Sequence, residues 1–332
     1  MTNLKKIGLS ALAGSLVAFS AQAGSLDVSG GAKFTYTGDT GAQDLEADGN
    51  RFGMQQLLSF TGGGELDNGH NIKLEHYIQA DGGGKSSSVL TYDMAEMGAL
   101  SYRQDSGDVG IGKIDDIMPT ADEEVWNGLD ADSISDGTES LNGRVDAGVT
   151  GFNYAYSMGM TSINVGYGLK GSGDSNDDGE NSGTGAVESS TSIAVSMKPI
   201  DGLRIVAGTG EKGATDSTSN DHTTYGFTYA TSFGLTVGAQ QSEIDFAAAG
   251  TKDLETDMYG VSFAVNDDLS ISYGSQETTA DGDSDKQKVT GVSVGYSMGS
   301  MTIKAHKNKA ENIQQVANVE SEHTEVAISF AF

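Results

Sequence analysis

The chain ends with Glu325-Val-Ala-Ile-Ser-Phe-Ala-Phe332, in which every second side chain is large and apolar. A period of two puts these apolar side chains on one face of a β-strand and the small or polar ones on the other. The same alternation recurs upstream, at residues 28–36, 163–170, 224–229 and 259–265. Since no convincing helical pattern follows residue 23, the sequence predicts an all-β protein.

Two kinds of connection separate the predicted strands: short turns and long polar, acidic stretches. The short ones are residues 105–107, 157–159, 200–202, 232–234, 266–268 and 297–299, and the long ones include 38–49, 171–186, 213–221 and 279–285. The runs number roughly sixteen, each of ~9–11 residues, which is the length with which a tilted strand crosses a bilayer. We therefore expect a transmembrane antiparallel up-and-down β-barrel with short periplasmic turns and long external loops.

Composition favours a hollow, water-lined barrel and excludes several other classes. The 332 residues are only 36% hydrophobic and include 47 glycines, two prolines and no cysteine. Glycine-rich disordered or collagen-like chains are normally rich in proline as well, and without cysteine there are no disulfides or thiolate metal sites. The formal charge of −28 argues against nucleic acid as a partner, because that binding needs cations. A soluble secreted β-sandwich or β-helix remains the alternative architecture.

The first 23 residues differ from the rest of the chain. Lys5 and Lys6 precede an apolar run over residues 7–19, and Ala21-Gln-Ala23 supplies the small residues that a signal peptidase needs. We predict a cleaved signal peptide over residues 1–23, followed by a single barrel domain over residues 24–332. That domain holds 17 basic and 47 acidic residues, a formal charge of −30.

The segment over residues 98–156 carries a more specific resemblance. Residues 98–104 and 108–113 resemble the strand–turn–strand that precedes the long constriction loop of Gram-negative general (non-specific) trimeric outer-membrane porins. Residues 114–141 resemble that loop, and residues 143–149 resemble the strand that re-enters the barrel wall with a constriction-zone arginine. The resemblance implies one long loop folded into the lumen, homotrimeric assembly and a place in the outer membrane of a Gram-negative bacterium.

The final strand adds to this resemblance, since it ends on an aromatic residue as terminal strands of outer-membrane barrels do. The resemblance implies that Phe330 and Phe332 form the signal that the barrel-assembly machinery recognises. The resemblance also implies contacts with outer-membrane lipids and lipopolysaccharide, and small hydrophilic solutes and ions as the transported species.

Residues 114–141 contain nine acids and no lysine or arginine. The segment is either a solvated external loop or a loop that narrows the lumen and faces basic side chains. The second interpretation predicts acidic constriction residues at Asp115, Asp116, Asp122, Glu123 and Glu124.

Basic candidates for the pore wall come from strand alternation, and from the resemblance in one case. Lys113 occupies the position where many relatives have arginine, but it shares strand parity with Val109 and Ile111, so an inward direction would need a bulge. The full set is Lys33, Arg51, Lys73, Arg103, Lys113 and Arg144. We expect the acids at positions 122–124 to face the basic residues at 33, 51 and 144 across a narrow water-filled gap.

Other motifs carry less weight. Asp174, Asn176 and Asp178 match the first half of a calcium loop, but Gly185 stands where the bidentate glutamate is needed. We therefore predict no cofactor and no dedicated metal site, with calcium or magnesium at most loosely bound at external loops. Residues 208–213 fit GxGxxG without a following helix, the five histidines show no ligand spacing, and no nucleophile motif indicates a hydrolase.

These features predict a passive diffusion pore rather than an enzyme, with mild cation selectivity because acids dominate its loops. Two alternatives stay open: a substrate-selective channel with a saturable site, and a structural or adhesive barrel whose acidic loops bind divalent cations. A substrate-selective channel would need a row of aromatic residues or of closely spaced basic residues along its lumen. The aromatic residues here lie mainly on the apolar faces of the predicted strands.

Overall fold

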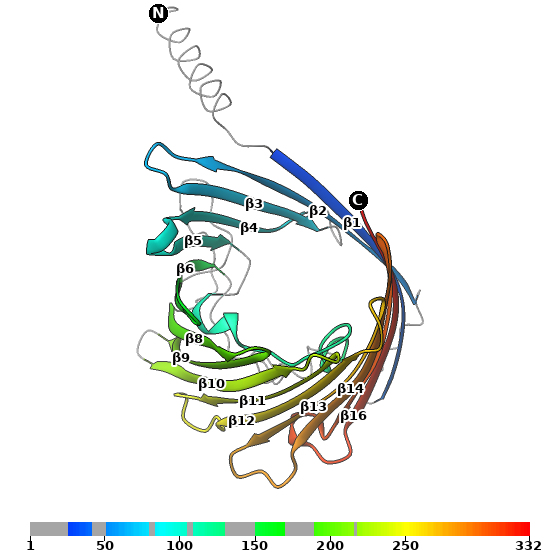
Figure 1. Cartoon of the computed structure of the whole chain (residues 1–332). Coiled ribbons are helices and arrows are strands. Elements are labelled where there is room, and N and C mark those ends of the chain that lie inside the picture. The colour runs from blue at the N-terminus through cyan, green and yellow to red at the C-terminus, as the bar shows by residue number, and fades with distance from the viewer. Residues whose placement is uncertain are drawn as a thin grey trace, which may run out of the picture.

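The computed structural model describes residues 26–41, 51–79, 84–104, 109–129, 150–169, 189–215 and 218–332. Sixteen antiparallel strands form one closed barrel (Figure 1), which confirms the predicted fold. The strands are β1 (Leu26–Gly41), β2 (Phe52–Glu65), β3 (Asn71–Gln79), β4 (Gly84–Asp93), β5 (Ala99–Gln104), β6 (Gly151–Met158), β7 (Thr161–Gly168), β8 (Ser190–Ile200), β9 (Leu203–Thr215), β10 (Thr218–Ala230), β11 (Leu235–Asp245), β12 (Leu254–Ala264), β13 (Leu269–Ala280), β14 (Gln287–Met298), β15 (Met301–Glu311) and β16 (Glu320–Ala331). Three short 3₁₀ helices accompany them: η1 (Ala95–Met97), η2 (Gly110–Lys113) and η3 (Ile313–Gln315). The predicted signal peptide lies outside the described residues.

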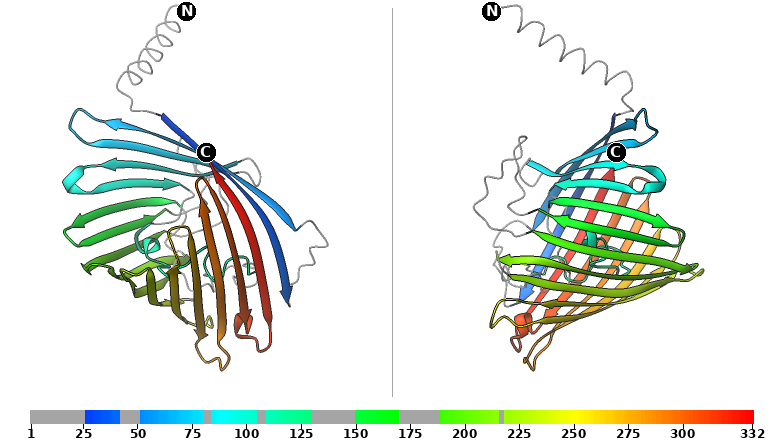
Figure 2. Two further views of the ribbon diagram at one scale, coloured as in Figure 1. Left: turned by 45° about the vertical axis from the view of Figure 1, so that its right-hand side comes forward. Right: turned by 90° about the vertical axis from the view of Figure 1, so that its left-hand side faces the viewer.

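β1 and β16 close the barrel, so the first and last strands lie side by side (Figure 2). Their pairing runs from Gly31 opposite Ala331 to Gly41 opposite Ser321. Beyond it, Gly30 and Phe332 exchange two backbone hydrogen bonds of 2.8 and 2.9 Å. Closure removes every free sheet edge, which is the part of a β-protein most prone to pair with another chain.

The two faces of the barrel wall have opposite character, as β10 illustrates. Tyr225, Phe227 and Tyr229 are exposed on the outside, whereas His222 and Thr224 are buried on the inside. This distribution is that of a barrel whose apolar face contacts lipid and whose polar face lines the lumen, and it explains the low hydrophobic content. Among the described helices, none has the length and apolar character needed to span a membrane.

The turns at one end of the barrel are two to five residues long: residues 66–70, 94–98, 159–160, 201–202, 231–234, 265–268 and 299–300. Short turns are thus confirmed near the predicted residues 157–159, 200–202, 232–234, 266–268 and 297–299, whereas the turn predicted at 105–107 lies outside the described residues. Connections at the other end include the longer stretches 246–253, 281–286 and 312–319. The predicted long loop over residues 213–221 is wrong, since β9 continues to Thr215 and β10 begins at Thr218. The side chains on both faces of these strand ends are polar, so the sequence shows no apolar alternation there. The backbone pairing between β9 and β10 nevertheless continues through them.

Candidate pore constriction

The segment over residues 109–129 enters the barrel and follows its inner wall (Figure 1). It contacts the inward face of successive strands: η2 packs on β7, β8 and β9, Ile117 bonds to β11, Ala121 to β13 and Asn127 to β15. We call residues 109–129 the inward loop.

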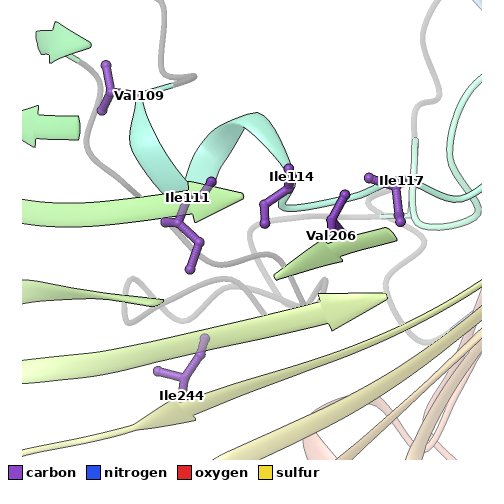
Figure 3. Close-up of a cluster of buried hydrophobic side chains, with 7 residues drawn as sticks. Val109, Ile111, Ile114, Ile117, Val206 and Ile244 are labelled. Atoms are coloured by element: carbon purple, nitrogen blue, oxygen red, sulfur yellow. The ribbon is translucent and has the colours of Figure 1, made fainter. Parts of the chain in front are cut away.

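The inward loop begins with an apolar anchor (Figure 3). Val109, Ile111, Ile114 and Ile117 form a buried cluster with wall residues of β8, β9 and β11, namely Ala194, Val206 and Ile244. Gly110 has a φ of +49°, and its N–H donates to Asn153 Oδ1 at 2.8 Å. A side chain at Gly110 would collide with β7 and β8, so only glycine fits this close approach.

This anchor corrects the predicted strand over residues 108–113. Its alternating apolar residues do not cover a membrane face, because they fill the cluster between the loop and the wall. Lys113 ends η2, and the strand-parity argument therefore does not apply to it.

Gln240 of β11 fastens the middle of the loop. Its Oε1 accepts the N–H of Ile117 at 2.9 Å, and its Nε2 donates to the carbonyls of Ile114 and Asp115 at 2.8 and 3.0 Å. The side chain is buried, so each of these loop groups would lose its partner without the amide. Gln240 thus replaces the partners that a strand neighbour would provide.

Four glycines form a track in which the loop lies. Gly238, Gly260, Gly274 and Gly291 are opposite one another across β11, β12, β13 and β14. Added side chains at the first two would collide with Pro119, and one at Gly274 would collide with Val125. At Gly291 an added side chain would collide with Asn308 and also crowd Val125. The high glycine content therefore serves close packing of the loop on the wall.

Asp122 anchors the loop to β15. Its carboxylate lies 3.1 Å from Lys304 Nζ and 2.9 Å from His306 Nδ1, and only 2% of the side chain is exposed. Burial acts to raise the pKa of this loop carboxyl, but the hydrogen bonds from His306 and Lys304 outweigh burial and hold the pKa below its usual value. The structure thus places Asp122 against the wall and not across a gap from Lys33.

Glu123 is the loop acid that reaches Lys33. The two side chains lie 3.4 Å apart, and Lys33 Nζ is also 2.7 Å from Glu325 of β16. The pair is therefore in direct contact, where we expected a water-filled gap. One cation shared by two partly exposed carboxylates leaves this group with a net negative charge.

Comparison with known proteins agrees with this architecture. The model of the Gram-negative porin family matches residues 8–332. This chain belongs to the Gram-negative porin family. No curated protein matches its sequence. The porin is an outer-membrane channel protein, as the family and fold together indicate.

Solved structures of other proteins share the fold of this porin at low sequence identity. A porin refined at 1.8 Å resolution is 13% identical with a TM-score of 0.64, covering 93% of this chain and 100% of its own. The anion-selective porin from Comamonas acidovorans is 16% identical with a TM-score of 0.64, covering 94% and 100%. The trimer form of OmpT from Vibrio cholerae is 12% identical with a TM-score of 0.63, covering 94% and 100%.

The remaining predicted acids of the porin shape the loop backbone. Asp115 accepts a hydrogen bond from the N–H of Asp116, and Asp116 accepts one from the N–H of Met118, at 2.9 and 2.8 Å. The carbonyl of Glu124 accepts a hydrogen bond from Asn308 of β15 at 3.1 Å. These contacts hold the segment in a fixed course along the wall.

The predicted basic residues of the porin do not gather at one point. Arg51 is exposed just before β2, beside Gly38. Lys73 pairs with Glu75 at 2.8 Å, and Arg103 is half-buried on β5. Arg144 and the calcium-like motif at Asp174, Asn176 and Asp178 lie outside the described residues.

Sequence reasoning missed the wall residues that hold the loop of the porin, namely Gln240, Lys304, His306, Glu325 and the glycine track. Each lies on the polar face of its strand by alternation, which marks it as inward-facing but does not indicate that it contacts the loop. Within the described part of the chain, no group of three or more His, Asp or Glu side chains is arranged to hold a metal ion.

The C-terminal residues of the porin lie where the alternation predicted. Phe330 and Phe332 are exposed on the apolar outer face, and the ring of Phe332 packs beside Gly30 of β1. Their role as an assembly signal stays a prediction.

Proposed function

We propose that the inward loop forms the constriction of a water-filled pore through which small hydrophilic solutes and ions diffuse passively, without covalent chemistry. The observation that carries this proposal is the contact of Glu123 with Lys33, because it brings the loop to β1 after its course along β7 to β15. A loop held over that distance narrows the lumen by its own cross-section. The described strands carry most of their exposed aromatic residues outside, which disfavours a substrate-binding aromatic track.

We also propose that the pore prefers cations. Lys304 largely offsets the charge of Asp122, whereas Lys33 is shared between Glu123 and Glu325, so an unbalanced negative charge faces the lumen. The Comamonas acidovorans relative is described as anion-selective on the same fold, so selectivity must depend on particular side chains. Charges at the narrowest point have the strongest effect on which ions pass, because every ion comes close to them there. Salt screens charges that lie more than ~8 Å from the ion at physiological ionic strength.

Replacing Glu123 and Glu325 together by glutamine tests the proposed constriction. We expect the cation preference to fall sharply, because the double variant turns a net negative group into the isolated cation of Lys33. The reversal potential of a single channel under a salt gradient measures this change. Glu96→Gln, which removes one negative charge from an exposed turn, should leave the reversal potential unaltered. A double variant with the selectivity of the parent would exclude these residues from the constriction.

We propose a homotrimer as the functional assembly. Its support is the trimer form of the OmpT relative, together with exposed apolar side chains on the first strands, such as Val28, Phe34 and Phe52. Light scattering in mild detergent should give the mass of three chains. A stable monomer would contradict this assembly.

We propose that outer-membrane lipids contact the apolar outer face, and that lipopolysaccharide meets the charged strand ends beyond it. Support comes from acids that lie directly opposite one another there, with Asp221 facing Asp245 and Glu243 facing Glu255. Like charges in such positions repel, so cations and lipid headgroups would relieve them. Any calcium or magnesium would be held loosely.

A further inference from the structure

Two histidines lie side by side where the inward loop meets β15 and β16. The ring centres of His306 and His323 are 5.3 Å apart, and both side chains are buried. His306 Nδ1 is 2.9 Å from the carboxylate of Asp122 on the loop, and His323 Nδ1 is 2.5 Å from that of Asp39 on β1. An ionised carboxylate only accepts hydrogen bonds, so Nδ1 is the protonated nitrogen in both rings.

The opposite nitrogen of each ring has no partner among the described residues. Nε2 of His306 and Nε2 of His323 are both buried. Gly128 covers the His323 ring so closely that any side chain at that position would overlap it. Next to the pair, Asn308 donates hydrogen bonds to the carbonyls of Glu124 and Asn127, which holds this part of the loop on the wall.

Several charged groups lie in contact with the pair or with its direct neighbours. Three elements of the wall and the loop contribute them: Asp122 and Glu123 from the loop, Lys304 from β15, Glu325 from β16 and Lys33 and Asp39 from β1. The pair therefore lies among charges of both signs, from four carboxylates and two lysines.

We propose that His306 and His323 are positioning residues that form a proton-sensitive clamp on the inward loop. In the neutral pair, each Nδ1–H donates to its carboxylate, and the unprotonated Nε2 needs no acceptor. A further proton puts a charged N–H donor at Nε2, in a buried place where none of the described residues accepts a hydrogen bond from it. The donor reaches water when the loop around Gly128 moves off the wall.

The proposal predicts a change in the loop when the solution is made acidic enough to add this proton. Its effect on ion flow rests on the proposed function, because that effect requires the loop to form the constriction. The movement of the loop does not depend on the proposed function. The movement and its effect on ion flow can therefore be tested separately.

Trp126 allows the movement to be measured without a label. It is the only tryptophan of the chain, it lies on the inward loop two residues from Gly128, and it packs against the buried cluster of Leu129, Val289, Ala310 and Ile313. We expect its fluorescence emission to shift to longer wavelength as the purified porin in detergent is taken from about pH 8 to about pH 5, across the histidine range.

The variants His306→Gln and His323→Gln identify the groups responsible. Glutamine keeps an N–H donor for the carboxylate but does not titrate, so the double variant should lose the emission shift. His70→Gln replaces a histidine in the turn between β2 and β3, away from the loop, and should keep the emission shift. A flat emission profile for the parent protein, or an unchanged shift in the double variant, would overturn the clamp. The parent profile decides the matter even where a variant fails to fold.

Single-channel conductance, measured over the same pH range, tests the link to the pore. We expect the conductance of the parent protein to change with the emission, and that of the double variant to stay constant. An emission shift without a conductance change would support the clamp and contradict the proposed constriction.

Discussion

We expect Gln240→Leu to release the inward loop while the barrel stays closed. The substitution keeps the approximate volume of a buried side chain but removes the partners of Ile117 N–H and of the Ile114 and Asp115 carbonyls. Each buried polar group left unsatisfied costs about 1–3 kcal/mol, so the loop loses several kcal/mol of attachment. The strand pairing of β11 does not depend on this side chain, so the cost falls on the loop and not on the wall.

Hydrogen exchange of the loop amides and single-channel conductance measure this release. We expect faster exchange over residues 109–129, together with a larger and noisier conductance. Gln241→Leu is the matched control, because Gln241 points to the opposite face and donates to Asp257 of β12 at 3.1 Å. Equal exchange rates in the two variants would show that Gln240 does not hold the loop.

The architecture of this barrel could be predicted because it depends on local alternation. The stretch ending at Phe332 places Val326, Ile328 and Phe330 on the outer face and Glu325 on the inner face, and the structure has both faces as predicted. Alternation fixes the face of each residue within its own strand. It therefore identifies inward residues such as Lys33 without information about the rest of the chain.

The partners of the loop could not be predicted, because they depend on which strand lies opposite after the barrel closes. Asp122 and His306 are 184 positions apart, and no local pattern connects them. Alternation was also misleading at Val109 and Ile111, since a buried cluster between loop and wall has the same apolar residues as a lipid-facing strand. The position of the inward loop thus depends on long-range contacts, whereas the barrel wall follows from the local sequence pattern.

Val165→Lys tests the assignment of the outer face. Val165 is 45% exposed on β7, between the outward side chains of Tyr154 on β6 and Ile193 on β8. A lysine near the middle of the lipid-facing band costs about 2–4 kcal/mol, so we expect a smaller folded fraction after refolding into lipid vesicles. Ser162→Lys places the same side chain on the lumen side of the same strand, where water solvates the ammonium group.

Comparing these two lysine variants shows which face of β7 contacts lipid, because both variants add a lysine side chain and one positive charge to the same strand. We expect Ser162→Lys to refold like the parent protein and to shift ion selectivity towards anions, since its charge lies in the lumen. Val165→Lys should leave the selectivity of the molecules that do fold unchanged, because a charge behind the barrel wall does not line the path of the ions. If the two variants refolded equally well, the face of β7 that we assign to lipid would be wrong.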